Sequence, residues 1–122
     1  DIEAMGSSQS SSAVIFHQDQ RRYPRRAYAH EVGVLCKGEY SIARGLDLGE
    51  GGLSFSSDLV FAQGMKMVLS FQVPMGSFLV VRAQVVRLQK DPESDRMMHA
   101  CSFLNIKFDH KREIRTFVSA RS

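Results

Sequence analysis

The sequence predicts an all-β fold, a six-stranded antiparallel β-barrel that carries one C-terminal helix. Three observations point to this class. Apolar and polar residues alternate with a period of two from Arg26 onward, which is typical of half-buried strands. Glycine, proline and polar clusters interrupt this alternation at short intervals, as turns between antiparallel strands do. The last residues change to helical spacing, and closing the sheet into a barrel would remove its exposed edges.

The first half of the chain predicts a hairpin and a short third strand. Ala27 to Cys36 forms the first strand and Tyr40 to Leu48 its antiparallel partner. Lys37-Gly38-Glu39 joins them as a compact turn with glycine at its centre. A glycine-rich segment follows, and the alternation resumes in a short strand from Leu53 to Ser56.

The second half predicts a longer hairpin. Met65 to Val73 is the fourth strand, after the turn at Gln63-Gly64, and Pro74-Met75-Gly76 separates it from the strand Ser77 to Gln89. Lys90 to Asp95 is the most polar loop of the chain and forms the tip of this hairpin. The last strand then runs from Met97 to Phe108.

A helix closes the predicted fold. Asp109 offers an N-cap, and His110 to Ala120 has Ile114, Phe117 and Val118 at helical spacing. We expect this apolar face to cover one end of the barrel.

The length of 122 residues predicts one domain, which we place at residues 20–122 after a lead-in of residues 1–19. Asp1 to Ser12 is polar, rich in serine and without periodicity, so it resembles a vector remnant or a disordered lead-in. Ala13 to Phe16 is too short for a signal sequence, although it could pack on the barrel as a short strand. No apolar stretch reaches the roughly 18 residues of a membrane span, so we expect a cytoplasmic protein.

The composition argues against catalysis and against a broad nucleic-acid surface. The net charge of +3 is small, and much of the excess comes from one arginine run, which favours a local anion site. Four histidines are scattered without metal-ligand spacing, and no nucleophile, phosphate-loop or paired-carboxylate motif is present. Cys36 and Cys101 lie on apolar strands and are predicted to be reduced and partly buried. We therefore expect no enzyme activity, no metal and no cofactor. The four histidines are His17, His30, His99 and His110.

The arginine run lies between Gln20 and Arg26, where four arginines surround Pro24. Arginine grips phosphate because its rigid fork of N–H donors matches two oxygens at once. Pro24 biases the segment toward extended backbone, on which alternate side chains share a side. The simpler interpretation is a solvated basic linker, and the run alone does not decide between the two. The four arginines are Arg21, Arg22, Arg25 and Arg26.

A second polar segment, Asp47 to Gly52, follows the first hairpin with the sequence DLGEGG. Glycine lets a ligand approach the main chain closely, and a carboxylate can accept paired N–H donors such as those of a guanine edge. Taken alone, a segment of this kind is most often a tight turn between strands.

Together the two segments resemble the PilZ domain, a bacterial receptor for cyclic di-GMP. The family motifs are RxxxR and, about twenty residues later, [DN]xSxxG at the start of a small split β-barrel. Arg21 and Arg25 match the first motif, and Arg22 with Arg26 is a second register. Asp47 and Gly52 match the second motif, whereas Gly49 replaces its serine and removes a hydroxyl from the site. The resemblance runs from Gln20 to the C-terminus.

The resemblance implies a ligand site made of the eight residues Arg21, Arg22, Arg25, Arg26, Asp47, Gly49, Gly51 and Gly52. The arginines would bind the phosphates and guanine O6 or N7, and the aspartate would accept from guanine N1 and N2. Arg44 and Arg87 are plausible further contributors. Binding would order the arm before the barrel, whose arginines repel one another without ligand, and pass the signal to an unknown protein effector.

Two other functions stay open at this point. A PilZ-like adaptor could act in motility or surface machinery without the nucleotide, as some family members do. A small barrel could instead bind single-stranded nucleic acid through aromatic and basic residues. Most of the phenylalanines fall on the inward phase of strands or on the helix, so we expect neither DNA nor RNA as partner. Biofilm and motility control are the expected processes.

Overall fold

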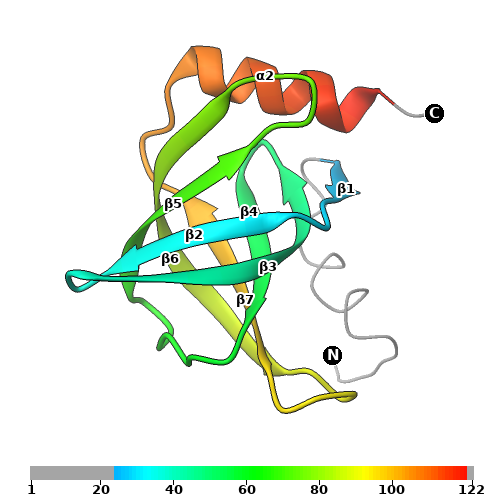
Figure 1. Ribbon diagram of the computed structural model, residues 1–122. Coiled ribbons are helices and arrows are strands. Elements are labelled where there is room, and N and C mark those ends of the chain that lie inside the picture. The colour runs from blue at the N-terminus through cyan, green and yellow to red at the C-terminus, as the bar shows by residue number, and fades with distance from the viewer. Residues whose placement is uncertain (1–23, 121–122) are drawn as a thin grey trace.

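The computed structural model describes residues 24–120, which form a closed antiparallel barrel with a helix across one end (Figure 1). The predicted lead-in, the possible strand at Ala13 to Phe16, Arg21 and Arg22 lie outside the described residues. The elements in chain order are β1 Arg25–Ala27, β2 Glu31–Cys36, β3 Glu39–Gly49, β4 Gly52–Ser57, β5 Lys66–Gln72, β6 Phe78–Lys90, β7 Met97–Phe103 and α2 Phe108–Ser119.

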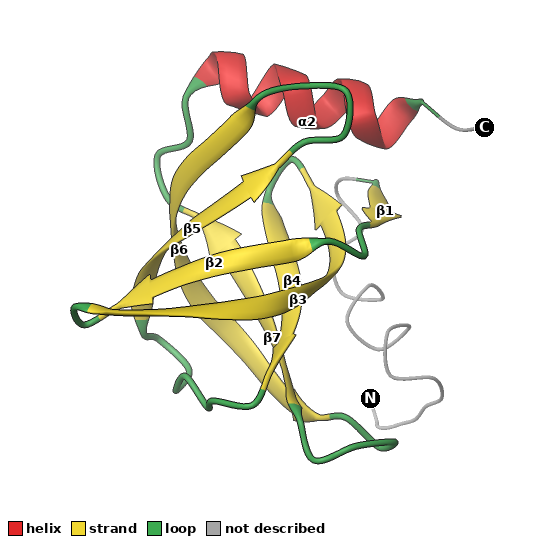
Figure 2. Cartoon of the chain, in the orientation of Figure 1, coloured by secondary structure: helices red, strands yellow, loops and turns green. Residues whose placement is uncertain are grey.

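The barrel closes through the pairing of β3 with β4. The sheet order is β1-β3-β2-β5-β6-β7-β4, so the additional β3–β4 contact joins the two ends into a ring of six strands. The short strand β1 pairs with β3 outside this ring, and every pairing is antiparallel (Figure 2). The predicted fold class is therefore confirmed, with one strand more than expected.

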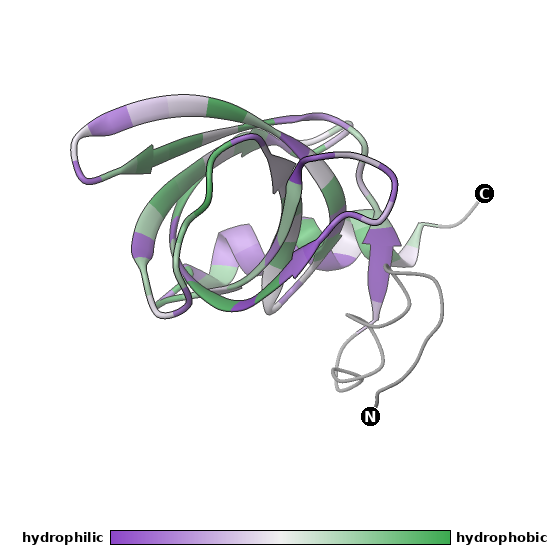
Figure 3. Cartoon of the chain, turned by 90° about the horizontal axis from the view of Figure 1, so that it is seen from below, coloured by the Kyte–Doolittle hydropathy of each residue, from purple (hydrophilic) through white to green (hydrophobic). Residues whose placement is uncertain are grey.

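The interior of the barrel is filled by the inward phase of each strand. Leu48, Leu53 and Phe55 have no exposed surface, and the strands trace a ring around this core when viewed from below (Figure 3). Both cysteines are free thiols and are buried, more deeply than predicted. Burial raises the pKa of Cys101 to about 12, although the charge of Arg25 opposes the shift.

The prediction of one strand from Ala27 to Cys36 was wrong, because the chain leaves the strand path at Tyr28. The Tyr28 side chain turns into the core and its hydroxyl donates to the carbonyl of Gln72 at 2.5 Å. Gly45 makes room for this turn, since a Cβ there would lie 2.7 Å from the Tyr28 ring and 2.6 Å from its carbonyl oxygen. The segment therefore splits into β1 and β2, which both pair with β3.

The end of the last strand was also predicted wrongly. β7 ends at Phe103 rather than Phe108, and Asn105 takes a left-handed φ of 52° that turns the chain toward the helix. The helix N-cap is Lys107, without a side-chain hydrogen bond, and Asp109 lies in the first turn instead. A carboxylate there still complements the helix dipole.

The predicted apolar face of the helix is confirmed. Ile114, Phe117 and Val118 are buried against the barrel. Figure 1 shows α2 lying across the end of the barrel beside the turn between β5 and β6. Between residues 24 and 120, no helix is long and apolar enough to cross a membrane.

Candidate functional site

The two predicted motif segments meet where β1 pairs with the end of β3. The register places Arg25 opposite Gly49, Arg26 opposite Leu48 and Ala27 opposite Asp47. Side chains alternate between the two faces of a strand, so Arg25 and Arg26 point to opposite sides of β1. The segment Pro24 to Ala27, called the arm below, therefore faces the glycine-rich segment with Arg25.

Arg25 is bonded to Asp47. Its Nε and Nη2 donate to the same carboxylate oxygen, Oδ1, at 3.0 and 2.8 Å. The exposed fractions of the two side chains are 18% and 15%, so the pair is shielded on most sides. In the described part of the chain both bonds go to Oδ1, which leaves Oδ2 of Asp47 as an acceptor. Repulsion between unpaired arginines was expected in the absence of ligand, but the charge of Arg25 is balanced by Asp47.

Gly49 allows the arm to lie flat on β3. A Cβ at this position would be 3.0 Å from the carbonyl oxygen of Pro24 and 3.2 Å from Cγ of Arg25. Such distances are tighter than normal packing, so a side chain would push the arm outward. Glycine in place of the motif serine thus allows β1 to lie close to β3 at this position.

Gly51 and Gly52 both contact β7 of the barrel. The carbonyl of Gly51 accepts from the amide of Phe103 at 2.8 Å. A Cβ on Gly52 would collide with the carbonyl oxygen of Cys101 on β7, so only glycine lets β4 and β7 approach this closely. The segment is a tight connection between Gly49 and Gly52, which are themselves paired.

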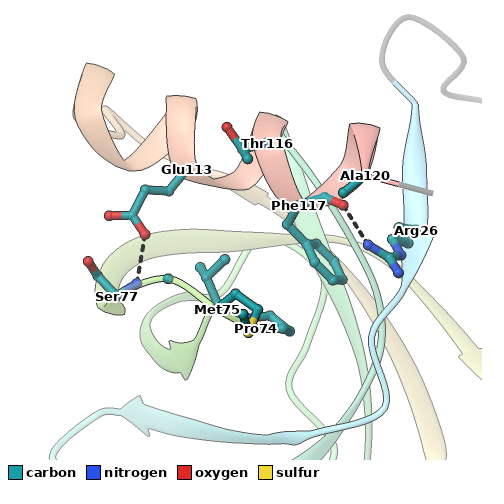
Figure 4. Close-up of a pocket in the computed structure, with 10 residues that line it drawn as sticks. Arg26, Pro74, Met75, Ser77, Glu113, Thr116, Phe117 and Ala120 are labelled. Atoms are coloured by element: carbon teal, nitrogen blue, oxygen red, sulfur yellow. Dashed lines mark hydrogen bonds between the residues drawn. The ribbon is translucent and has the colours of Figure 1, made fainter. Parts of the chain in front are cut away.

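Arg26 binds the helix. Its Nη1 donates to the carbonyl of Phe117 at 2.7 Å, and its guanidinium carbon lies 4.5 Å from the centre of the Phe117 ring (Figure 4). The same carbonyl also accepts from the Ala120 amide at 3.3 Å, so Arg26 adds a second donor near the helix C-terminus. The sequence predicted Arg26 as a ligand-binding residue and gave no sign of this contact.

Glu50 provides a second tie between the motif segments and the helix. Both of its carboxylate oxygens accept from Arg115, from Nε at 3.0 Å and from Nη2 at 3.1 Å. The bonds and charge of Glu50 raise the pKa of Arg115 above its ordinary value. Glu50 is 11% exposed at its side chain. This pair is not apparent from the sequence, since the two residues are far apart in the chain.

The two further candidates, Arg44 and Arg87, lie on β3, which also carries Asp47, and on β6. Asp47 pairs with Ser54, Ser54 with Ala100, and Ala100 with Arg87, so these four residues form one row over four strands. The Ser54 hydroxyl is buried and has no hydrogen-bond partner among residues 24–120. The sequence alone could not show that this hydroxyl lies beside Asp47. Arg44 is exposed on β3, opposite Ser56.

The histidine of β7 belongs to the core. His99 has no exposed surface, stacks on Phe55 at 4.8 Å, and accepts a hydrogen bond at Nε2 from the Phe61 amide at 3.0 Å. Burial lowers its pKa, and the neighbouring carbonyls of Met97 and Phe55 oppose the shift. Within residues 24–120, no group of three or more histidine, cysteine or carboxylate side chains could hold a metal.

Solved structures share this fold at low sequence identity. The inhibitor of motility MotI/DgrA of Bacillus subtilis aligns with a TM-score of 0.73 and 19% identity over 82% of this chain and 49% of its own. YcgR of Escherichia coli in complex with c-di-GMP gives 0.64 and 17%, over 81% of this chain and 44% of its own. The PilZ domain of YcgR with c-di-GMP gives 0.60 and 19%, over 82% and 89%.

The chain thus spans about half the length of the first two structures. A search of curated protein sequences returned no match. The family model described as PilZ domain matches residues 19–120, which is nearly the whole chain. The protein therefore belongs to the PilZ domain family.

Proposed function

We propose that this chain binds cyclic di-GMP at the junction of β1 and β3 and passes the signal to a protein partner. The observation that carries the proposal is the contact between Arg25 and Asp47, one from each motif, at 2.8 Å. A guanidinium and a carboxylate side by side offer complementary groups to a guanine, whose O6 and N7 accept and whose N1 and N2 donate. The solved complexes of YcgR with c-di-GMP support this choice of ligand.

The ligand would exchange one set of bonds for another. In the structure, Asp47 neutralises Arg25, so a nucleotide phosphate must compete with an existing ion pair. Cyclic di-GMP brings two negative charges together with guanine donors, so it can satisfy both Arg25 and Asp47 after they separate. A simple inorganic anion could replace only the carboxylate. Arg21, Arg22, Gly49, Gly51 and Gly52 complete the proposed site.

The relay would act through α2. Arg26 and Glu50 follow directly on the proposed ligand groups and hold the helix at Phe117 and Arg115. A ligand that moves the arm or the glycine-rich segment would therefore change two helix contacts at once. A tie at two points converts a local change in bonding into a shift of a rigid element.

The same helix borders a cavity that such a shift would reshape. The cavity has a volume of about 580 Å³ and lies between α2 and the β5–β6 turn (Figure 4). Arg26 and Phe117 line one side, and Met75 of the turn is fully exposed. On the other side Glu113 accepts from the Ser77 amide at 2.7 Å and joins helix to turn.

The second candidate function is an adaptor that binds a protein and no nucleotide. Gly49 in place of serine and the existing neutralisation of Arg25 favour it. An equilibrium titration with cyclic di-GMP, with GTP and a single-stranded oligonucleotide as competitors, separates the candidates. We expect a saturable signal that neither competitor removes. We also propose that the receptor is cytoplasmic and has no enzyme activity of its own.

A further inference from the structure

A second surface lies toward the β2–β3 turn, at the opposite end of β3 from Asp47, where that turn projects at the left of Figure 2. Outward-facing side chains of β2, β3 and β6 are apolar here and remain open to solvent. Leu35 is 43% exposed, Tyr40 63% and Val80 57%. Several large apolar side chains exposed on one sheet face are unusual for a protein surface and mark an interaction site.

The strand register joins these side chains into a continuous row. Tyr40 pairs with Leu35, Leu35 with Val68, and Val68 with Arg82, so the row crosses β3, β2, β5 and β6. Residues that pair across antiparallel strands point to the same face. The row therefore runs from an aromatic ring over two aliphatic side chains to a guanidinium.

Two adjoining depressions lie along this row. The larger has a volume of about 600 Å³ and is lined by Leu35, Val68 and three cationic side chains. The smaller has a volume of about 250 Å³ and is lined by Val80, Ile106, Lys107 and His110. Arg82, Leu104 and Asn105 line both, so the depressions are neighbours on the surface. The three cationic side chains of the larger depression are Lys37, Lys66 and Arg82.

The positive charges of this surface are not compensated. Lys37, Lys66, Arg82 and Lys107 are exposed, and neither depression is lined by a carboxylate. Of the ion pairs between residues 24 and 120, none includes these four side chains. By contrast, Arg25 at the proposed nucleotide site is paired with Asp47. In α2, Arg115 is paired with Glu50 and Arg112 with Asp109. The surface therefore combines apolar contact area with free cations.

The apolar row and the two depressions beside it are called the groove below. We propose that this groove binds an acidic segment of a partner protein, in which aspartates or glutamates alternate with aliphatic or aromatic side chains. The apolar row would take the hydrophobic side chains, and the four cations would pair with the carboxylates. The depressions have the size of a few side chains each, which suits a peptide better than the plane of a membrane. This inference rests on the proposed function, because the groove would bind the protein partner named there. The residues that line the groove are separate from those of the proposed nucleotide site, so peptide binding does not require the nucleotide.

The test uses the whole chain, labelled with nitrogen-15, and a short synthetic peptide in which glutamates alternate with leucines and phenylalanines. We expect saturable shifts of amide signals confined to residues 35–38, 66–68, 80–84 and 104–107. The double substitution Lys66→Glu and Arg82→Glu should weaken binding about tenfold or more, because it replaces attraction by repulsion at the rim. Lys90→Glu makes the same kind of charge change at the far end of β6 and should leave binding unchanged.

Several results would overturn the proposal. These are the absence of saturable shifts, equal binding of a matched peptide with lysines in place of glutamates, and an equal loss with Lys90→Glu. Stronger binding to vesicles of phosphatidylserine and phosphatidylcholine than to the peptide would assign the face to a membrane. Self-association abolished by Leu35→Lys would assign it to a second copy. Arg25→Ala separates the two sites, since it should retain the peptide while weakening cyclic di-GMP; peptide failure with intact nucleotide binding contradicts only the groove.

Discussion

Arg25 donates two hydrogen bonds to a single oxygen of Asp47, at 3.0 and 2.8 Å, and so links the two motif segments before any nucleotide binds. This contact holds β1 on the barrel and keeps the guanidinium at the proposed guanine site. A site assembled in this way loses less conformational entropy on binding than a free arm would. It also requires the ligand to compete with the carboxylate.

Restoring the motif serine tests that competition. In Gly49→Ser, the new Cβ would lie 3.0 Å from the Pro24 carbonyl oxygen and 3.2 Å from Arg25 Cγ, so the arm must move outward. We expect a lower melting temperature and a cyclic di-GMP affinity higher by about 1 kcal/mol, because the ion pair loosens and a hydroxyl is gained. Thermal denaturation and calorimetric titration measure the two effects. Weaker nucleotide binding in this variant would show that the arm position matters more than the hydroxyl.

The unsatisfied hydroxyl of Ser54 makes a second prediction. Ser54→Ala removes a buried oxygen that has no partner in the described part of the chain, so the folded protein should keep or gain stability. If the hydroxyl bonds the ligand, the same change should weaken cyclic di-GMP binding by about 1 kcal/mol. Ser70→Ala, on the opposite half of the barrel, is the control. Equal nucleotide affinity in Ser54→Ala and the wild type would remove Ser54 from the site.

The barrel and its helix could be predicted from local patterns, whereas the contacts of the site could not. Period-two alternation located the six barrel strands, and the spacing of Ile114, Phe117 and Val118 located the buried face of α2. The break at Tyr28 depends on the space above Gly45, which is set by tertiary packing and leaves no local sign. The ties of Arg26 and Glu50 to the helix were missed for the same reason.

The proposed relay can be tested from the helix side. Arg115→Ala cuts the bond to Glu50 and leaves the proposed ligand groups in place. We expect nucleotide binding to persist while the shift of amide signals at residues 113–120 on nucleotide addition falls by about half, since one of two ties is lost. Nitrogen-15 spectra with and without cyclic di-GMP measure this. Arg112→Ala removes an exposed arginine one turn away and should respond like the wild type; an identical response of both variants contradicts the relay.

His99 should make stability depend on pH. Burial lowers its pKa in the folded state below the ordinary 6.5, so the unfolded chain takes up a proton first as the pH falls. Stability is therefore complete above this value and is lost as the pH decreases below it. His99→Gln keeps an acceptor for the Phe61 amide but cannot titrate. Between about pH 7.5 and 5.5 its melting temperature should fall less than that of the wild type.

The control for this experiment is His110→Gln, which leaves the buried histidine in place and should keep the wild-type pH dependence. If His99→Gln loses stability with falling pH as steeply as the wild type, other groups cause the decrease.

The central claim is tested most directly by isothermal titration of the chain and of Arg25→Ala with cyclic di-GMP, with GTP as the control ligand. We expect saturable binding by the wild type, no heat with GTP, and a loss of about 2 to 4 kcal/mol in Arg25→Ala, the scale of charge-assisted contacts in a shielded site. The fitted stoichiometry would give the number of nucleotides bound. Equal affinity of the two proteins, or no binding by the wild type, would contradict the account.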